Sequence, residues 1–430
     1  MKISRLLVIL LLVIAVAMFL SGCDPEETAN TDNIVENTEA SSSTTNPETS
    51  SGTIENSKPS DEIFQGNMAD FSIEMFKKTI SNEKNTLVSP LSIMLALTMT
   101  ANGADGETLA QMETVLGGDI ALSDLNEYLN SYVNGLPSDE KSKLGIANSI
   151  WIRDTDNRVV INPDFLQKNT DFFNASINRS AFNEQTVSDI NNWVSHYTDG
   201  MIDRVIDEIS SEVLMYLINA VVFDAEWQNA YEEGYTRKGD FTDINRRTTE
   251  VDFMHSDERM YLEDDRAIGF IKPYVYNHYS FVALLPNEGI SIFDYVSSLT
   301  GEDFIKTIEN VQYTSVRASL PKFKFEYSRT LNNDLISLGM PLAFDSYNAD
   351  FSKMGTTTNE NIYIGQVLHK TFIEVSELGT RAGAVTTVTM RTTSVMIDEP
   401  KIVRLDRPFL FAIIDNKTKL PVFIGTVLMI

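Results

Sequence analysis

The chain of 430 residues contains a single cysteine, Cys23, and only four histidines. One cysteine cannot form an internal disulfide, so the fold must be stabilised by its core. Beyond Cys23 there is no thiol, which excludes a cysteine nucleophile and a thiolate metal site in the rest of the chain. The histidines are His196, His255, His278 and His369. Their spacing matches no metal-binding motif, so we expect neither a metal nor a cofactor.

The sequence also lacks the local motifs of common enzymes. It has no GxSxG nucleophile elbow, no phosphate-binding P-loop and no GxGxxG after a strand. A Ser-His-Asp triad assembled from distant residues stays open here, because triads are recognised in space. These absences favour a binding or inhibitory protein over an enzyme.

Basic residues are scarce: 34 Lys and Arg stand against 61 Asp and Glu, and the formal net charge is −27. Such a chain repels phosphate backbones, so we expect no nucleic-acid partner. The hydrophobic content of 43% is that of an ordinary globular protein.

The N-terminal segment has the pattern of a secretory signal. Lys2 and Arg5 precede an apolar stretch over residues 6–20, which is short for a membrane span of roughly 20 residues. The following Leu-Ser-Gly-Cys resembles a bacterial lipoprotein box, in which Cys23 becomes the lipidated first residue of the mature chain. Residues 1–22 are therefore predicted to be a lipoprotein signal peptide, with plain secretion as the alternative.

Residues 23–62 consist mainly of Ser, Thr, Asn and Glu. Such a segment cannot bury enough apolar surface to fold, so we expect a flexible tether. Residues 63–430 have globular composition without a second linker, which predicts one folded domain. Acyl chains on Cys23 would hold this domain at the extracytoplasmic face of a membrane, with no other membrane contact.

Helical patterns dominate the first half of the chain and strand patterns the second, which predicts an α+β fold. Ser89-Pro90 is typical of a helix start, with a capping serine before proline. Helices are expected at residues 91–99, 106–116, 122–133 and 187–197. Strands are expected at residues 213–223, 280–285, 316–320, 370–375, 409–414 and 422–429.

The segment from residue 377 to 400 does not fit a plain globular pattern. After Gly379 comes a run of small and β-branched residues, with strand propensity but too little apolar bulk to anchor itself in a core. As a strand, it would place on one face the uncharged side chains of Thr380, Ala382, Ala384, Thr386 and Val388. The charged Arg381 would lie on the other face. The segment could therefore join a crowded sheet, and the alternative is an ordinary edge strand and loop.

Five segments, in the same order along the chain, resemble the serpin family. They are residues 85–93, 102–112, 190–202, 217–227 and 403–413. The resemblance implies three β-sheets with eight or nine helices and an exposed reactive-centre loop. It also implies a serine protease inhibitor that acts as a suicide substrate. The protease cuts the loop and stays attached as an acyl-enzyme, while the cut loop inserts into the largest sheet.

The resemblance implies roles for individual residues. The hinge that enters the sheet first would comprise Glu377, Gly379, Thr380, Arg381, Ala382, Gly383, Ala384 and Val385, with Arg381 standing where the family commonly has Glu. Four residues match a buried polar cluster under the parting strands, the shutter: Ser89, Ser92, Asn191 and His369. Trp227 matches the breach, the point of loop entry, with a plain core tryptophan as the alternative. The reactive bond is expected at Thr393-Ser394, with Arg391 or Val395 as alternatives.

Two interpretations of function stay open. The small hinge residues favour a monomeric inhibitor that forms a covalent complex with a serine protease, or with a papain-like cysteine protease. The alternative is a non-inhibitory serpin that acts as a surface binding protein. Neither interpretation makes the protein an enzyme.

Overall fold

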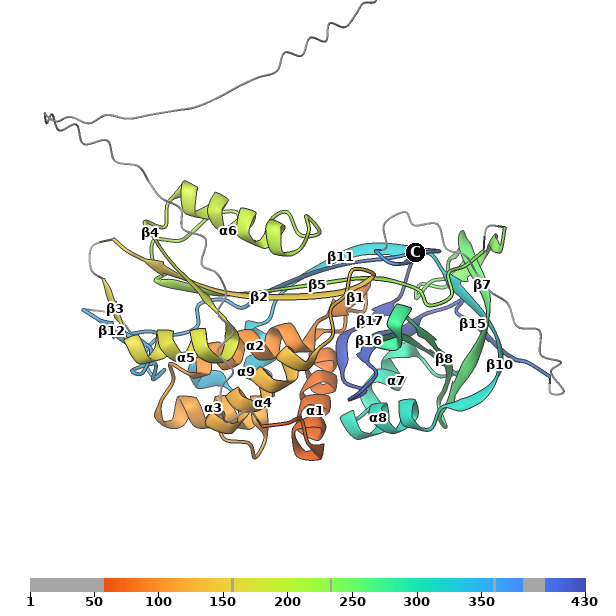
Figure 1. Ribbon diagram of the computed structural model, residues 1–430, viewed down its shortest axis with the longest axis horizontal. Helices are drawn as coiled ribbons and strands as arrows, with labels where there is room; N and C mark the ends of the chain where they lie inside the picture. The colour runs from red at the N-terminus through yellow and green to blue at the C-terminus, as the bar shows by residue number, and fades with distance from the viewer. Residues whose placement is uncertain (1–57, 156–157, 233, 359–360, 382–398) are drawn as a thin grey trace, which may run out of the picture. The chain divides into compact units, whose positions relative to one another are not determined.

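The structure, a computed structural model, describes residues 58–155, 158–232, 234–358, 361–381 and 399–430 (Figure 1). The predicted signal peptide, Cys23 and the tether up to residue 57 lie outside these ranges. The hinge from Ala382 to Val385 and every candidate for the reactive bond, Arg391 to Val395, also lie outside them. The predicted roles of these residues therefore stay predictions.

The described residues form nine α-helices, and local sequence explains where several begin. Asp61 caps the first helix by accepting a hydrogen bond from the Phe64 amide, and Ser89 with Pro90 starts the second. The helices are α1 (Glu62–Thr79), α2 (Pro90–Ala101), α3 (Gly106–Gly117), α4 (Leu122–Gly135), α5 (Pro163–Phe173), α6 (Glu184–Tyr197), α7 (Ile292–Ser298), α8 (Gly301–Glu309) and α9 (Asn332–Leu338).

The strands of the described ranges form three sheets. The six-stranded sheet has the order β11 (Phe323–Thr330), β13 (Leu368–Val375), β14 (Gly379–Thr380), β5 (Met215–Glu226), β2 (Ser142–Arg153) and β4 (Ser176–Ser180). The nine-stranded sheet has the order β1 (Thr86–Val88), β17 (Pro421–Val427), β16 (Phe409–Asp415), β9 (Tyr279–Pro286), β8 (Ala267–Pro273), β7 (Thr248–Glu263), β10 (Gln312–Pro321) and β15 (Lys401–Arg404), with β6 (Thr236–Thr242) also paired to β7. A two-stranded sheet joins β12 (Gly355–Thr357) to β3 (Val159–Ile161).

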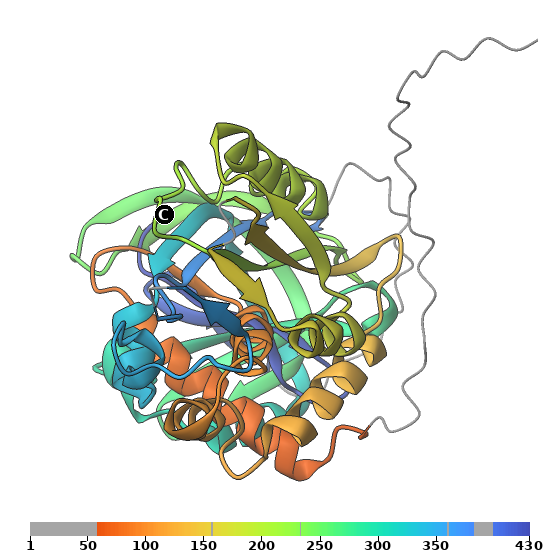
Figure 2. The ribbon, with the colours of Figure 1, turned by 90° about the vertical axis from the view of Figure 1, so that its left-hand side faces the viewer.

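The six-stranded sheet is covered by helices on both faces. Helices α1 to α5 lie on one side of it and α6 lies on the other (Figures 1 and 2). Strand β13 alternates accordingly: His369, Thr371, Ile373 and Val375 are buried, while the residues between them are more exposed. The inner face of this sheet therefore belongs to the main core, and the outer face lies toward α6.

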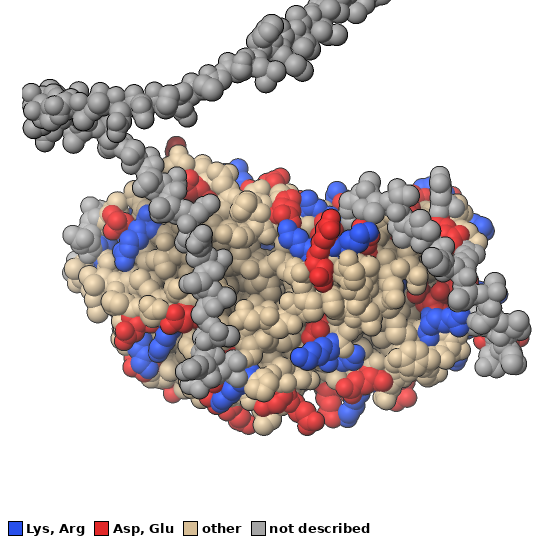
Figure 3. Space-filling model, in the orientation of Figure 1, with Lys and Arg blue, Asp and Glu red and all other residues tan. Residues whose placement is uncertain are grey.

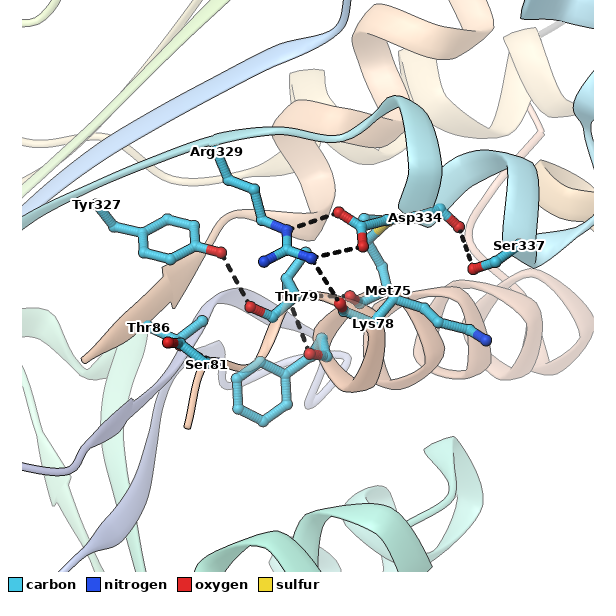
Figure 4. Close-up of polar contacts among 10 residues, drawn as sticks. Met75, Lys78, Thr79, Ser81, Thr86, Tyr327, Arg329, Asp334 and Ser337 are labelled. Carbon is cyan, nitrogen blue, oxygen red and sulfur yellow. Dashed lines mark hydrogen bonds and ion pairs between the residues drawn. The ribbon is translucent and has the colours of Figure 1, made fainter. Parts of the chain in front are cut away.

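One edge of the six-stranded sheet is anchored to the helical layer (Figure 4). The Arg329 guanidinium of β11 donates to both oxygens of Asp334 on α9, at 2.6 and 2.7 Å, and to the Lys78 carbonyl at the end of α1. The Tyr327 hydroxyl donates to the Thr79 carbonyl at 3.0 Å. These contacts hold β11, and β13 through β11, against the core.

The expected α+β class with three sheets is confirmed. The predicted helices at 91–99, 106–116, 122–133 and 187–197 lie within α2, α3, α4 and α6, and the predicted strands overlap β5, β9, β10, β13, β16 and β17. The expected division into a helical first half and a strand-rich second half is only partly right. The long strand β2 lies in the first half, and α7 to α9 lie in the second, because tertiary packing overrides local propensity there.

Candidate functional site

The six-stranded sheet is parted between β5 and β13. Only the two-residue strand β14 lies between them: Thr380 pairs with Val375 of β13 on one side and with Ala225 of β5 on the other. No described residue of β13 pairs directly with β5. The gap between the two strands is thus filled at one end by β14, and along the rest of its length no described residues pair across it. We call its two ends the filled end and the open end.

A small cavity lies in this gap directly beyond Thr380. Its walls include Val221 and Phe223 from β5 and Phe372 and Ile373 from β13. Met201 and Ile202, which follow α6, complete the lining on the outer side. The place where a further inserted residue would lie is therefore already partly hollow.

The filled end of the gap rests on a cluster around Trp227. The Trp227 ring is buried and stacks on Tyr274, with centroids 4.5 Å apart, and its Nε1 donates to the Ser376 carbonyl at 2.8 Å. The Tyr274 hydroxyl and the Thr380 hydroxyl are 2.5 Å apart and share a hydrogen bond. Trp227 therefore holds the turn that leads into the hinge, and Tyr274 holds the first inserted side chain.

Glu377 is held at the start of the hinge. Lys322 donates to the Glu377 carboxylate at 2.8 and 3.0 Å, and Thr236 donates to it at 3.0 Å. Burial alone would raise the pKa of Glu377, but the hydrogen bonds from Lys322 and Thr236 outweigh it and hold the pKa below its usual value. The start of the segment is thus tied by an ion pair.

Arg381 ends the inserted strand. Its φ of 43° lies in the left-handed region, which interrupts the extended backbone. Its amide donates to the Glu374 carbonyl at 2.7 Å, and its Nη2 donates to the Asp199 carbonyl at 2.9 Å. The side chain lies on the outer face, as the alternation predicts, and Thr380 lies on the inner face with 3% of its surface exposed.

The open end of the gap holds a buried histidine. The Ser89 amide donates to His369 Nε2 at 3.1 Å, and the Ser92 amide donates to the Ser89 hydroxyl at 3.3 Å. Burial lowers the pKa of His369 to about 4, so its imidazole is neutral at physiological pH. The structure therefore brings Ser89, Ser92 and His369 together beneath the sheet.

Asn191 does not belong to this cluster, and its assignment to the shutter is wrong. It lies half-buried on α6, where its side chain accepts from the Val205 and Ile206 amides and donates to the Ile206 carbonyl. It thereby holds the segment after α6, which Lys370 of β13 also contacts through the Arg204 carbonyl. The physical reason is that Asn191 faces away from the sheet interior.

Asn219 of β5 is the asparagine that sequence reasoning missed. Its Nδ2 donates to Asn148 at 2.8 Å, while its buried Oδ1 has no hydrogen-bond partner among the described residues. A polar residue within the apolar stretch Leu217–Phe223 was the available signal. Tyr274 carried no comparable signal, because its contact with Thr380 joins residues more than 100 positions apart.

The described residues hold no group of three or more His, Cys, Asp or Glu arranged to bind a metal. Within the described ranges, no helix is both long and apolar enough to cross a membrane. On the face shown in Figure 3, basic side chains lie among acidic ones rather than in a single patch.

The six-stranded sheet is parted between β5 and β13, with the two-residue strand β14 between them at one end, and this arrangement defines the class of fold. A family model described as serpin (serine protease inhibitor) matches residues 66–430. The chain therefore belongs to the serpin family, as the resemblance predicted.

Individual relatives agree with this assignment. The crystal structure of tengpin, a thermophilic serpin, in the native state has 54% sequence identity and a TM-score of 0.82, covering 87% of this chain and 97% of that one. Tengpin in the latent state gives a TM-score of 0.78 at 52% identity, covering 87% and 100%. Human Serpin B8 is 33% identical over 83% of this chain and 96% of its own length. Thyroxine-binding globulin in complex with thyroxine, at 23% identity and a TM-score of 0.73 over 85% of this chain and 98% of its own, shares the fold.

Proposed function

We propose that this serpin is a suicide inhibitor of serine proteases. The observation that carries the proposal is the gap between β5 and β13, which β14 fills only at one end. A sheet held open in this way can accept one more strand. The segment that follows Thr380 is covalently placed to supply it.

The covalent step follows ordinary acyl transfer. The protease serine hydroxyl attacks the carbonyl carbon of the residue before the scissile bond, its proton passes to the protease base, and an ester forms. The peptide bond breaks, and the new amino terminus leaves with a proton. Insertion of the cut segment then distorts the protease before water can hydrolyse the ester, because the protease needs its oxyanion hole and triad held closely in place.

The walls of the gap match the residues that would enter it. In an antiparallel pair, each step forward along one strand is a step back along the other. Continuing the register of Thr380 would place Ala382 between Phe223 and Ile373, where a small side chain faces two large ones. The same register would place Thr386 between His369 and Asn219.

A threonine between His369 and Asn219 would make the free energy of insertion more favourable. Asn219 Oδ1 is buried without a partner among the described residues, and a buried unsatisfied acceptor costs about 1 to 3 kcal/mol. A threonine hydroxyl beside it can donate the missing hydrogen bond. The intact protein would then be kinetically rather than thermodynamically stable.

For the reactive bond we propose Thr393-Ser394, with Arg391 or Val395 as alternatives. Strand β5 begins at Met215, which the register places opposite residue 390. A cut after Thr393 would leave a strand that reaches this end with a short linker to the protease. A cut after Arg391 would leave two residues fewer, or about 6.6 Å less reach at roughly 3.3 Å per residue. We expect such a cut to favour plain cleavage over trapping.

The experiment is a protease panel that includes elastase-like, subtilisin-like, trypsin-like and papain-like enzymes. The expected result is an SDS-stable complex with at least one of them, and a released C-terminal peptide whose mass identifies the scissile bond. Cleavage by every protease without any stable complex would contradict inhibition. It would favour a non-inhibitory surface binding protein instead.

We further propose that Cys23 carries a lipid that anchors the protein outside the cell. The lipoprotein box before Cys23 and the tether-like composition of residues 23–62 support this localisation. Growth with an alkyne-labelled fatty acid should label the protein in a bacterial host, and Cys23→Ala should abolish the label. Equal labelling of the variant would contradict the anchor.

A further inference from the structure

Two acidic residues face each other across the gap, one step beyond the filled end. Asp224 lies on β5 and Glu374 lies on β13, and both occupy the outer face between buried neighbours. Strand register relates them to the hinge. Thr380 lies opposite Ala225 and Val375, so the next residue, Arg381, would fall opposite Asp224 and Glu374 in a continuous strand.

Arg381 stands close to this position but does not occupy it. Its amide already donates to the Glu374 carbonyl, which is the first ladder bond of that register. Its positive φ then interrupts the extended backbone, and its guanidinium donates to the Asp199 carbonyl rather than to either carboxylate. The Nη1 of this guanidinium is buried and has no hydrogen-bond partner among the described residues.

The Asp224 carboxylate also lacks a partner. Its carboxylate makes no hydrogen bond or ion pair with any described residue, whereas its neighbour Glu226 pairs with Lys141 at 3.2 Å. Burial raises the pKa of Asp224 to about 6. Arg381 and Lys143 act in the lowering direction, while Asp199 and Glu226 act in the raising direction. A half-buried, unpaired carboxylate thus lies beside a guanidinium that is not fully bonded.

We propose that Asp224 and Glu374 form an acidic receptor for Arg381, which leaves the Asp199 carbonyl and enters between the two carboxylates when the hinge becomes a continuous strand. This inference rests on the proposed insertion of the loop and adds a register-setting role for Arg381. The side chains of directly opposed residues lie on the same face of a sheet, so the guanidinium would meet both carboxylates on the outer face. Glu374 would exchange or share its present partner, Lys324, at 2.9 Å.

The receptor explains a residue that departs from the family pattern. A glutamate at position 381 would face two carboxylates and be repelled, whereas arginine is attracted by both. A shift of the register by one residue would move Arg381 to the inner face, where a charge cannot be accommodated. Arg381 therefore favours this register over the register that is shifted by one residue.

The matched pair of variants is Asp224→Asn and Glu226→Gln. Both remove one carboxylate charge from the outer face of β5, but Glu226 lies opposite Gly379, away from Arg381. The measured quantity is the difference in unfolding midpoint between the intact protein and the same protein cleaved in the loop. Asp224→Asn should narrow this difference for two reasons. It removes an unpaired, half-buried carboxylate from the intact protein, and it removes a partner of Arg381 from the cleaved protein. Glu226→Gln should leave the difference unchanged.

Charge reversal provides a second test. Arg381→Glu should narrow the difference more than Asp224→Asn does. Adding Asp224→Arg to Arg381→Glu should restore part of the loss. With a trapped protease, Asp224→Asn should raise the number of inhibitor molecules consumed per protease by roughly two- to fivefold, as expected for a cross-strand ion pair.

The outcomes separate this inference from the proposed function. Equal effects of Asp224→Asn and Glu226→Gln, or an Arg381→Glu variant without effect, would overturn the receptor even if the wild type traps proteases. Conversely, if the wild type traps no protease but Asp224→Asn narrows the midpoint difference and Glu226→Gln does not, inhibition would be overturned and the receptor kept. A wild type whose cleavage does not raise the midpoint would overturn the receptor directly.

Discussion

The two ends of the gap between β5 and β13 differ in how completely their polar groups are satisfied. At the filled end, Thr380, Tyr274 and Trp227 all make hydrogen bonds, and the Tyr274 and Trp227 rings stack. At the open end, Asn219 has a buried oxygen without a partner among the described residues, and His369 is kept neutral by burial. The filled end sets a register, and the open end retains one buried acceptor, Asn219 Oδ1, that an inserted strand would satisfy in the proposed mechanism.

Under the proposed function, this difference explains how one sheet could be ordered at one end and still gain stability from a further strand. A buried acceptor that is left unsatisfied is costly, so the open end lowers the stability of the intact protein. In the proposed mechanism, the filled end fixes where insertion begins, because the inserted strand would extend from Thr380. The following changes test the two ends separately.

The largest effect is expected from Thr380→Arg at the filled end. Thr380 is 3% exposed, and an unpaired charge there would cost on the order of several kcal/mol. The variant should be cut in the loop without trapping the protease, which gel electrophoresis in SDS would reveal. Thr380→Ser, which keeps the hydroxyl near Tyr274, should still form the complex. Normal trapping by Thr380→Arg would show that the register is wrong.

The next effect concerns the anchor beside the open end. Arg329 lies opposite His369 in the register of β11 with β13, and its partner Asp334 has only 8% of its side chain exposed. Asp334→Ala would leave the guanidinium without its carboxylate and with only the Lys78 carbonyl as a partner, and should lower the free energy of unfolding by about 3 kcal/mol in urea titrations. The exposed pair of Lys306 and Glu302 serves as the control, since Glu302→Ala should cost less than about 0.5 kcal/mol. Equal losses in both variants would contradict an anchoring role.

His369 makes the open end sensitive to acid. A histidine with a pKa of about 4 in the folded state binds fewer protons there than in the unfolded state, whose pKa is near 6.5. Its neutral form therefore stabilises the protein above pH 6.5, and this contribution is lost between pH 6.5 and 4. At pH 5 the loss should reach about 2 kcal/mol. His369→Gln should reduce the drop in unfolding free energy between pH 7.5 and pH 5 by that amount. An unchanged drop would show that His369 is not buried in its neutral form.

The smallest effect is expected from Trp227→Phe. This change keeps an aromatic ring against Tyr274 but removes the hydrogen bond from Nε1 to the Ser376 carbonyl. The expected loss is about 1 kcal/mol in unfolding free energy. Trp227→Ala should lose about 3 to 5 kcal/mol, because it also opens a cavity. Similar losses in the two variants would show that the hydrogen bond, rather than the ring, carries the stabilisation.

The sequence predicts the structure best where short-range geometry decides the conformation. The cap at Ser89-Pro90 and the alternation that separates Thr380 from Arg381 follow from short-range geometry, and the structure places these residues accordingly. The helix and strand assignments agreed for the same reason. The family resemblance also predicted the three sheets and the position of Trp227 near the hinge, which composition alone does not predict.

The failures concern residues whose partners lie far along the chain. Asn191 was assigned to the shutter from its place in a matching segment, but the direction of its side chain depends on how α6 packs. Tyr274 acquires its significance from a hydrogen bond to Thr380, more than 100 residues away. Asn219 and Asp224 acquire theirs from the register that Thr380 sets with Ala225. No local pattern encodes that pairing.

Hydrogen exchange measured before and after loop cleavage tests the central claim most directly. If the cut segment enters between β5 and β13, amides in residues 217–223 and 369–373 should exchange more slowly in the cleaved protein. Amides of β11 serve as the internal control, because β11 pairs with the far side of β13 and its partners do not change. Slower exchange in β5 and β13 with constant exchange in β11 is the predicted result. Unchanged exchange in β5 and β13 after complete cleavage would contradict the account.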